Sequence, residues 1–174
     1  MRNLFSFTAA AAMAAGALGA LGALGAAAPA AAQDYSATRV VKAVDVDDLK
    51  AVVGELGHTV AQEGNYGPVS VAAQTESGTN YLLIGTACNV GDVAGCQGVM
   101  VQIRFDADAS IADERLLRAN LAQAAVNTWR DQSGTIGVTR YVVLDHGITM
   151  ANLSANVQVL LGLAPSVVQT LIGE

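Results

Sequence analysis

Between residues 45 and 57, apolar residues recur at the spacing of one face of a helix. In DVDDLKAVVGELG the apolar positions i, i+3, i+4 and i+7 are Leu49, Val52, Val53 and Leu56. Asp45 is suited to the N-cap of such a helix, and Gly57 is suited to its C-terminal end. We therefore predict an amphipathic helix that begins at Asp45 and ends before Gly57.

After residue 57 the pattern changes to the shorter period of β-strands. The segments HTVAQE (58–63), PVSVAAQTE (68–76) and NYLLIGTAC (80–88) are short and partly β-branched or aromatic, and ESGTN (76–80) is a turn signal. In the clearest strand, VMVQIRF (99–105), one face carries four apolar residues and the other carries Met100, Gln102 and Arg104. We predict an edge strand over 58–63, a hairpin over 68–88, and a strand over 99–105 with one face in the core.

The second half of the chain predicts a long helix, a second hairpin and a final helix. The segment 112–132, with a cap at Ser110 and an end at Gly134, has apolar residues at helical spacing: Leu117, Leu121, Ala124, Ala125 and Trp129. TRYVVL (139–144), the turn DHG and ITMANL (148–153) predict a hairpin, and the tail beyond Ser154 predicts a helix broken at Pro165.

The expected order of elements is helix, three or four strands, helix, two strands, helix. Every predicted connection between strands is short, and short connections join antiparallel strands. We therefore predict an α+β fold with a largely antiparallel sheet packed against helices.

The first 32 residues have the layout of a secretory signal peptide. Arg2 precedes a long run of Ala, Gly and Leu that ends in small residues, and the A-x-A rule places cleavage after Ala30-Ala31-Ala32. The mature chain would then begin at Gln33 or Asp34. The run is long enough to cross a hydrocarbon layer of about 30 Å, so retention as a membrane anchor is the alternative, but its Ala and Gly make it weakly hydrophobic.

Cleavage changes how the rest of the chain is interpreted. We expect a periplasmic or secreted bacterial protein without stable membrane insertion, with a polar lead-in over 33–44 and a single domain over 45–174. About 140 residues are enough to bury a core in one domain. Without Arg2, 8 basic and 15 acidic residues give a net charge of −7, and the basic residues are scattered. Nucleic acid is therefore not an expected partner, because phosphate binding needs a clustered basic surface.

The sequence contains LGHTV (56–60), YLLIG (81–85), the Cys88/Cys96 pair, MVQIRF (100–105) and VNTWR (126–130). Together these segments resemble the YbjN family of proposed bacterial sensory-transduction regulators. The resemblance covers about residues 45 to 173; Arg130 stands where relatives are expected to have Asn. It implies a fold like that of type III secretion chaperones and a regulatory or chaperone-like association, and it implies no known reaction.

Cys88 and Cys96 are the only cysteines, and seven residues separate them. This spacing excludes a redox C-x-x-C motif and is unsuited to a metal site, which also needs further ligands. In an exported protein the pair predicts a structural disulfide with Cα atoms about 4.4 to 6.8 Å apart. Reduced thiols packed in the core are the alternative.

Asn127 and Trp129 are candidates for a partner-binding surface. Trp129 is the only tryptophan, and a Trp of large area serves an interface as well as a core. Packing in the core is the other interpretation of Trp129, and Asn127 is equally suited to hydrogen bonding near the end of a helix.

Few residues of this sequence are candidates for catalysis. His58 directly follows the predicted helix end, and Asp145 and His146 lie in the turn DHG. G-x-S-x-G, H-E-x-x-H and phosphate-loop motifs are absent from the sequence. We therefore expect no catalytic residues, no bound metal and no cofactor.

These observations favour an exported, non-enzymatic accessory domain, chaperone-like or sensory and regulatory, that binds another protein. The alternative is a small-ligand-binding domain or a weak hydrolase, which would need a polar pocket around His58 or His146. The resemblance also allows a homodimer, because chaperone-like relatives tend to associate, although no apolar stripe in the sequence demands one.

Overall fold

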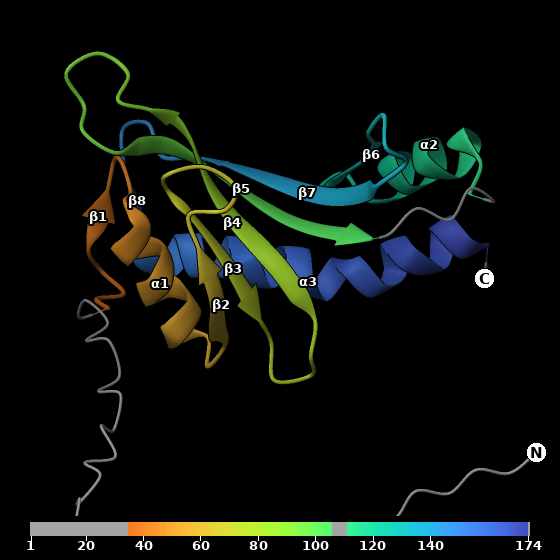
Figure 1. Cartoon of the computed structure of the whole chain (residues 1–174), viewed down its shortest axis with the longest axis horizontal. Helices are drawn as coiled ribbons and strands as arrows, with labels where there is room; N and C mark the ends of the chain where they lie inside the picture. The colour runs from red at the N-terminus through yellow and green to blue at the C-terminus, as the bar shows by residue number, and fades with distance from the viewer. Residues whose placement is uncertain (1–34, 106–110, 174) are drawn as a thin grey trace, which may run out of the picture.

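The structure is a computed structural model that describes residues 35–105 and 111–173 (Figure 1). The predicted signal peptide (1–32) and the predicted cap Ser110 lie outside the described residues. The elements in chain order are β1 (Val40–Val41), α1 (Val46–Glu55), β2 (Thr59–Glu63), β3 (Ser70–Gln74), β4 (Asn80–Cys88), β5 (Cys96–Phe105), α2 (Asp113–Ala122), β6 (Asn127–Arg130), β7 (Ile136–Val143), β8 (Ile148–Thr149) and α3 (Met150–Ile172).

The first predicted helix, α1, is confirmed together with its cap. The Asp45 side chain accepts a hydrogen bond from the Asp48 N–H at 2.9 Å, and the Asp48 carboxylate accepts one from the Asp45 N–H at 3.3 Å. This reciprocal pair is a capping box, which satisfies two N–H groups at the helix start. Gly57 follows the helix with a φ of +71°, a left-handed conformation that suits glycine.

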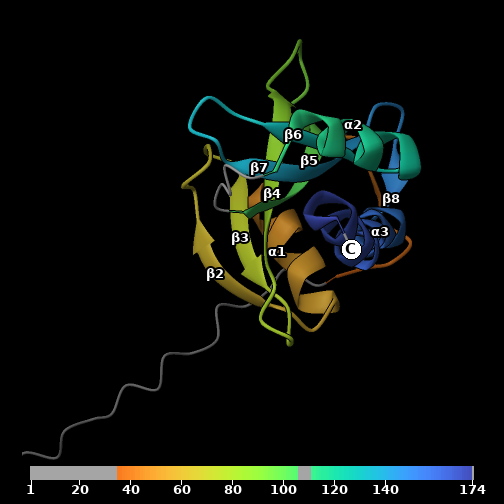
Figure 2. The same cartoon turned by 90° about the vertical axis from the view of Figure 1, so that its right-hand side faces the viewer.

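Six strands form one antiparallel sheet in the order β2-β3-β4-β5-β7-β6 (Figure 2). The α+β class and the antiparallel sheet are therefore confirmed. The predicted alternation over 99–105 is also confirmed, because Val99, Val101 and Ile103 are buried in the core that the helices share. A separate two-stranded sheet pairs β1 with β8.

One side of the six-stranded sheet is covered by helices. α1 packs against β2 and β3, α3 packs against β5 and β7, and α2 packs against β6 and α3. The strand residues that alternate with these core positions form the opposite side, which we call the helix-free face. Its members are Thr59, Gln62, Ser70, Ala72, Gln74, Asn80, Leu82, Ile84, Thr86, Gly98, Met100, Gln102, Arg104, Asn127, Trp129, Gly137, Thr139, Tyr141 and Val143.

The predicted long helix over 112–132 is wrong in its second half. α2 ends at Ala122, and Asn127–Arg130 form the strand β6 beside β7. Leu117 and Leu121, two members of the predicted apolar stripe, are 60% and 78% exposed. Leu116 and Ala119 are buried in their place, so the helix turns a different face to the core.

The second predicted hairpin and the break at Pro165 are also wrong. Only Ile148–Thr149 of the second segment is extended, and these residues pair with Val40–Val41, not with β7. α3 begins at Met150 and continues through Pro165. Residues assigned to the polar lead-in contribute to the core, since Val41 and Val44 are buried.

α3 is long and apolar enough to cross a membrane by length and composition alone, with a mean hydropathy of 1.5 over 18 residues. In the fold, a stripe that includes Leu153, Val157, Leu160 and Val167 is buried. The core helix of a water-soluble protein passes the same test, and the buried stripe accounts for part of the apolar character of α3, because 28% of that window is buried.

Candidate functional site

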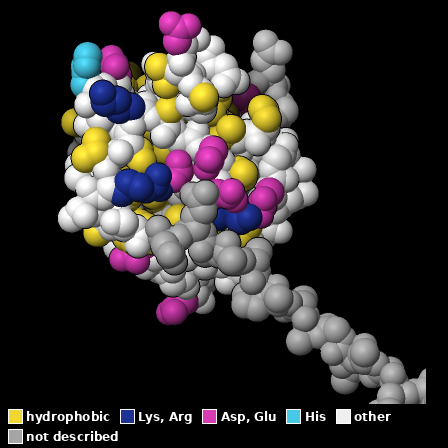
Figure 3. All heavy atoms as spheres, turned by 90° about the vertical axis from the view of Figure 1, so that its left-hand side faces the viewer, with side chains coloured by type: hydrophobic (Ala, Val, Ile, Leu, Met, Phe, Trp, Pro, Cys, Tyr) yellow, Lys and Arg dark blue, Asp and Glu magenta, His cyan; other side chains and the backbone are white. Residues whose placement is uncertain are grey.

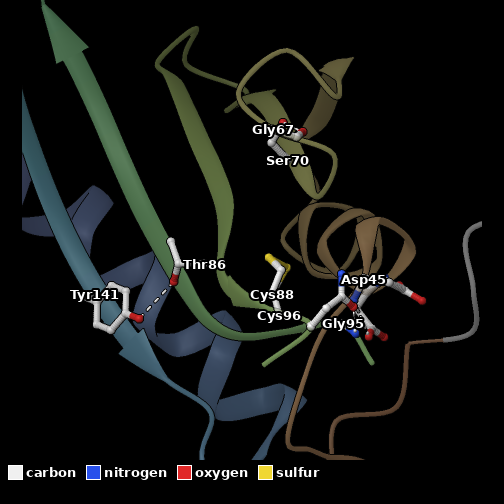
Figure 4. The surroundings of a disulfide bond; sticks show 10 residues. Asp45, Gly67, Ser70, Thr86, Cys88, Gly95, Cys96 and Tyr141 are labelled. Atoms are coloured by element: carbon white, nitrogen blue, oxygen red, sulfur yellow. Dashed lines mark hydrogen bonds between the residues drawn. A yellow bond between two sulfur atoms is a disulfide. The ribbon is translucent and has the colours of Figure 1, made fainter. Parts of the chain in front are cut away.

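The structure joins Cys88 and Cys96 in a disulfide with an S–S distance of 1.98 Å (Figure 4). The two residues lie directly opposite each other where β4 ends and β5 begins. Their Cα atoms are 3.8 Å apart, closer than the 4.4 to 6.8 Å expected from the sequence. The pair closes the loop of residues 89–95 that connects the two strands.

Cys96 is held by its backbone as well as by its sulfur. Its N–H donates to the Val44 carbonyl at 2.9 Å, and its carbonyl accepts from the Val44 N–H at 3.0 Å. A Cβ atom at Gly85 would lie 2.6 Å from the Cys96 sulfur, so glycine is required for this close approach. These contacts and the full burial of Cys96 are what a disulfide with a structural role requires.

Trp129 lies on the helix-free face and outside the core that the helices cover. Its indole ring lies across Gly137 of β7, where an added Cβ atom would be 2.1 Å from the ring carbon Cζ2. Its Nε1–H donates to the Thr139 hydroxyl at 2.7 Å. Asn127, two residues earlier on the same strand, shares this face and is exposed. The structure therefore brings both predicted partner-binding residues to one surface, on a strand instead of a helix.

Arg104 and Tyr66 extend this surface, and the sequence analysis did not identify either as a site residue. The Arg104 guanidinium carbon lies 4.8 Å from the Tyr66 ring centre and 5.8 Å from the Trp129 ring centre. Both distances are within the range of cation–π attraction. The Arg104 Nε–H also donates to the Gln102 side chain at 3.0 Å. The strand alternation placed Arg104 on the face opposite the core without marking it as a site, whereas Tyr66 lies in a loop without a periodic signal.

A second aromatic ring lies across a glycine on the same face. Tyr141 is 53% exposed, and a Cβ atom at Gly98 would be 2.3 Å from its hydroxyl oxygen. The Thr86 hydroxyl donates to that oxygen at 3.0 Å (Figure 4). Trp129 and Tyr141 thus each lie against a glycine on a neighbouring strand, where any larger residue would clash with the aromatic side chain.

A pocket of about 340 Å³ opens beside the Arg104 stack. Its walls include the side chains of Tyr66 and Arg104, and its lining includes Gln62, Ala72, Asn80 and Leu82. The pocket therefore combines one cation and two amide side chains with small and branched apolar groups.

The helix-free face carries almost no charge. Arg104 is its single charged residue, although the chain has 15 acidic and 9 basic residues. On the end of the molecule seen in Figure 3, by contrast, acidic and basic side chains lie among neutral ones. Depletion of charge together with half-buried Trp and Met and exposed Tyr and Arg is the composition of a protein interface.

The two histidines do not meet in the structure. The His58 Nδ1 atom is hydrogen bonded to the Tyr81 hydroxyl at 2.9 Å. His146 is exposed in the turn between β7 and β8, where its nearest charged neighbour is Asp145 at 3.6 Å. Among the described residues, no three His, Cys, Asp or Glu side chains gather as a metal site would require.

Comparisons with known proteins show similarity only at the level of structure. No model of a known protein family matches the chain, and no curated protein matches it by sequence. The chaperone–effector complex of HopA1 and SchA matches with a TM-score of 0.47 and 14% identity, over 71% of this chain and 96% of that one. At this TM-score the match adds nothing to the assignment of the fold.

The second solved structure is YbjN from E. coli, described as a candidate transcription regulator. It matches with a TM-score of 0.56 and 13% identity, over 74% of this chain and 91% of that chain. The resemblance expected from the sequence is therefore confirmed in structure, and at this identity it concerns the fold alone. The chain has an α+β fold similar to that of YbjN, and its described residues form a six-stranded antiparallel sheet, a two-stranded sheet and three helices.

Proposed function

We propose that this chain is an exported, non-enzymatic accessory domain that binds another protein on its helix-free face. The observation that carries the proposal is the composition of that face, where Trp129, Tyr141 and Met100 accompany a single charged residue, Arg104. Trp, Tyr and Arg dominate the energetics of protein interfaces, and charged residues are depleted at interface centres.

Export is part of the proposal and is supported by two features of the chain. The N-terminal pattern is that of a secretory signal peptide. The Cys88–Cys96 disulfide is suited to an oxidising compartment, because cytosolic thiols are kept reduced. A chaperone-like or sensory role in the periplasm or outside the cell would require the chain to bind a partner protein and would require no catalysed reaction.

A second candidate function, binding of a small molecule, is favoured by the pocket of about 340 Å³ beside Arg104. That volume is at the lower end of the range for small-ligand sites. A hydrolase receives no such support, because His58 is engaged by Tyr81 and His146 lies exposed in a turn.

Site-directed photocrosslinking in living cells tests the proposal. A photoreactive amino acid replaces Tyr141 on the helix-free face or, as a control, the exposed Leu121 on α2. We expect discrete protein adducts from position 141 and none from position 121. Gly137→Ala in the same chain should remove the adducts, because the added Cβ atom displaces the Trp129 ring.

Two results would count against the proposal. Equal adducts from both positions would mean that the face is not specific. Absence of adducts at position 141, together with a saturable small-molecule ligand of the pocket in a metabolite screen, would favour the second candidate function.

A further inference from the structure

The charge on the helix-free face is concentrated at one point. Arg104 is the one charged residue among the members of that face, and the chain as a whole has a net charge of −6. Among the residues that the structure describes, the ion pairs of arginine and lysine engage Arg39, Lys50 and Arg130, and none joins Arg104 to a carboxylate within 4.0 Å. A positive charge on an otherwise uncharged face is complementary to a negative charge on whatever docks there.

Arg104 is also held in position before any partner arrives. The rings of Tyr66 and Trp129 lie within 4.8 and 5.8 Å of its guanidinium carbon, and its Nε–H is bonded to Gln102. An arginine that is already ordered loses less conformational entropy when it forms a further hydrogen bond. Its planar fork of N–H groups matches a carboxylate, which it can bind through two parallel hydrogen bonds.

The pocket supplies an apolar site next to this cation. Arg104 and Tyr66 form part of its wall, and Ala72 and Leu82 contribute apolar surface. A volume of about 340 Å³ is too large for a carboxylate alone and is open to one apolar side chain with its neighbours.

We propose that the helix-free face recognises an acidic segment of a partner protein, with an Asp or Glu carboxylate on Arg104 and an adjacent apolar side chain in the pocket. This inference rests on the proposed function, because it names the chemistry of the segment that docks on the same face. Arg104 supplies the preference for acid, and Trp129 and Tyr66 hold the guanidinium in place.

Selection of peptides from a displayed random decapeptide library tests the inference. The full chain is compared with Arg104→Gln and with Arg118→Gln, which makes the same chemical change on the exposed surface of α2. We expect the unaltered chain and the Arg118→Gln variant to enrich peptides with Asp or Glu beside an apolar residue. The Arg104→Gln variant should keep the apolar preference and lose the acidic one.

Affinity measurements on a selected peptide give the size of the effect. Changing its acidic residue to the matching amide should weaken binding to the unaltered chain by at least about tenfold, because a hydrogen bond to a charged group is lost. The same change should have little effect on binding to Arg104→Gln. The difference should shrink as salt concentration rises, since an exposed ion pair is screened.

The outcomes separate this inference from the proposed function. Enrichment of peptides without acid, or an acidic preference that survives in Arg104→Gln, would overturn the inference and leave the docking face standing. If the unaltered chain enriched no more peptides than the Gly137→Ala variant, both the inference and the proposed function would be overturned. Binding of benzoate through Arg104, with no peptide enrichment, would assign the pocket to small acids and also overturn both.

Discussion

Tyr81 is the largest fully buried side chain among the described residues, with an exposed fraction of 1%. Its hydroxyl reaches the edge of the core, where it is hydrogen bonded to His58 Nδ1 at 2.9 Å. The two rings meet edge to face with centres 5.5 Å apart. Burial raises the pKa of the Tyr81 phenol well above its usual range, because the charged phenolate is poorly solvated there.

This raised pKa predicts a loss of stability in alkali. The folded-state pKa lies above the unfolded value of about 10, so the stabilisation is fully present below about pH 10 and is lost as pH rises towards the folded pKa. Tyr81→Phe should lower the free energy of unfolding at pH 7 by about 1 kcal/mol through the lost hydrogen bond. It should also flatten the fall in stability above about pH 10.

Urea unfolding from pH 7 to pH 11.5 measures both effects. Tyr141→Phe is the matched control, because it removes the same hydroxyl from an exposed ring. Parallel alkaline curves for the unaltered chain and Tyr81→Phe would show that Tyr81 does not control the alkaline transition.

At the scale of elements, α2 protects the outer edge of β6. The Asn120 side chain accepts a hydrogen bond from the Thr128 N–H at 2.6 Å and donates one to the Thr128 carbonyl at 3.1 Å. The Thr128 hydroxyl donates in turn to the Leu116 carbonyl at 3.0 Å. An edge strand with unpaired backbone groups is a template for unwanted pairing, and Asn120 occupies the N–H and carbonyl groups of Thr128 on this edge.

Asn120→Ala should therefore destabilise the chain by about 1 to 3 kcal/mol, because the Thr128 backbone groups lose their partners. Hydrogen exchange should be faster at the Thr128 amide than in the unaltered chain. Leu121→Ala on the same helix is the control and should change stability by less than about 0.5 kcal/mol, since Leu121 is exposed. A large effect of Leu121→Ala would instead support the helical stripe predicted from the sequence.

The same elements show how far sequence patterns predict this fold. α1 and β5 were predicted because each has a local signal, a cap at Asp45 and an alternation of seven residues. β6 has only four residues, and Trp129 also fits a helical spacing, so local pattern could not distinguish strand from helix. The segment forms a strand because it pairs with β7, and the local sequence does not reveal that pairing.

Two residues of the candidate site were predicted from the sequence, and its arrangement was not. Asn127 and Trp129 were identified because Trp suits an interface, yet the ring lies over Gly137, a contact between different strands. Arg104 joins them only because β5 and β6 lie on either side of β7. Contacts between strands that lie apart in the chain depend on the order of the strands in the sheet. The sequence predicted that the strands are antiparallel and did not predict their order.

At the scale of the whole molecule, the disulfide joins the start of the fold to the sheet. Val44 precedes α1 and exchanges two backbone hydrogen bonds with Cys96, which the sulfur bridge links to β4. The disulfide thus lies where the N-terminal segment, β4 and β5 meet. Val44 and Cys96 belong to the same hydrophobic core as the rest of the sheet and the three helices, which supply most of its residues.

Reduction of the disulfide should lower the thermal midpoint and leave the fold intact. Closing so short a loop is worth about 2.5 kcal/mol in the chain-entropy description. The double variant Cys88→Ala/Cys96→Ala should unfold at the same temperature with and without reductant, which makes it the control. Thiol labelling of unreduced, denatured protein from the exported fraction gives the oxidation state. Two alkylated cysteines would contradict both the disulfide and the proposed export.

Trp129 is the only tryptophan of the chain, and it lies on the helix-free face beside Arg104. The near-ultraviolet emission excited at long wavelength therefore comes from a single point of the surface. Tyr81, in contrast, lies in the core on the other side of the sheet. The protein thus carries a single intrinsic fluorophore on this face. Binding of a partner there shifts the emission wavelength of Trp129, and Tyr81 in the interior does not contribute to this signal.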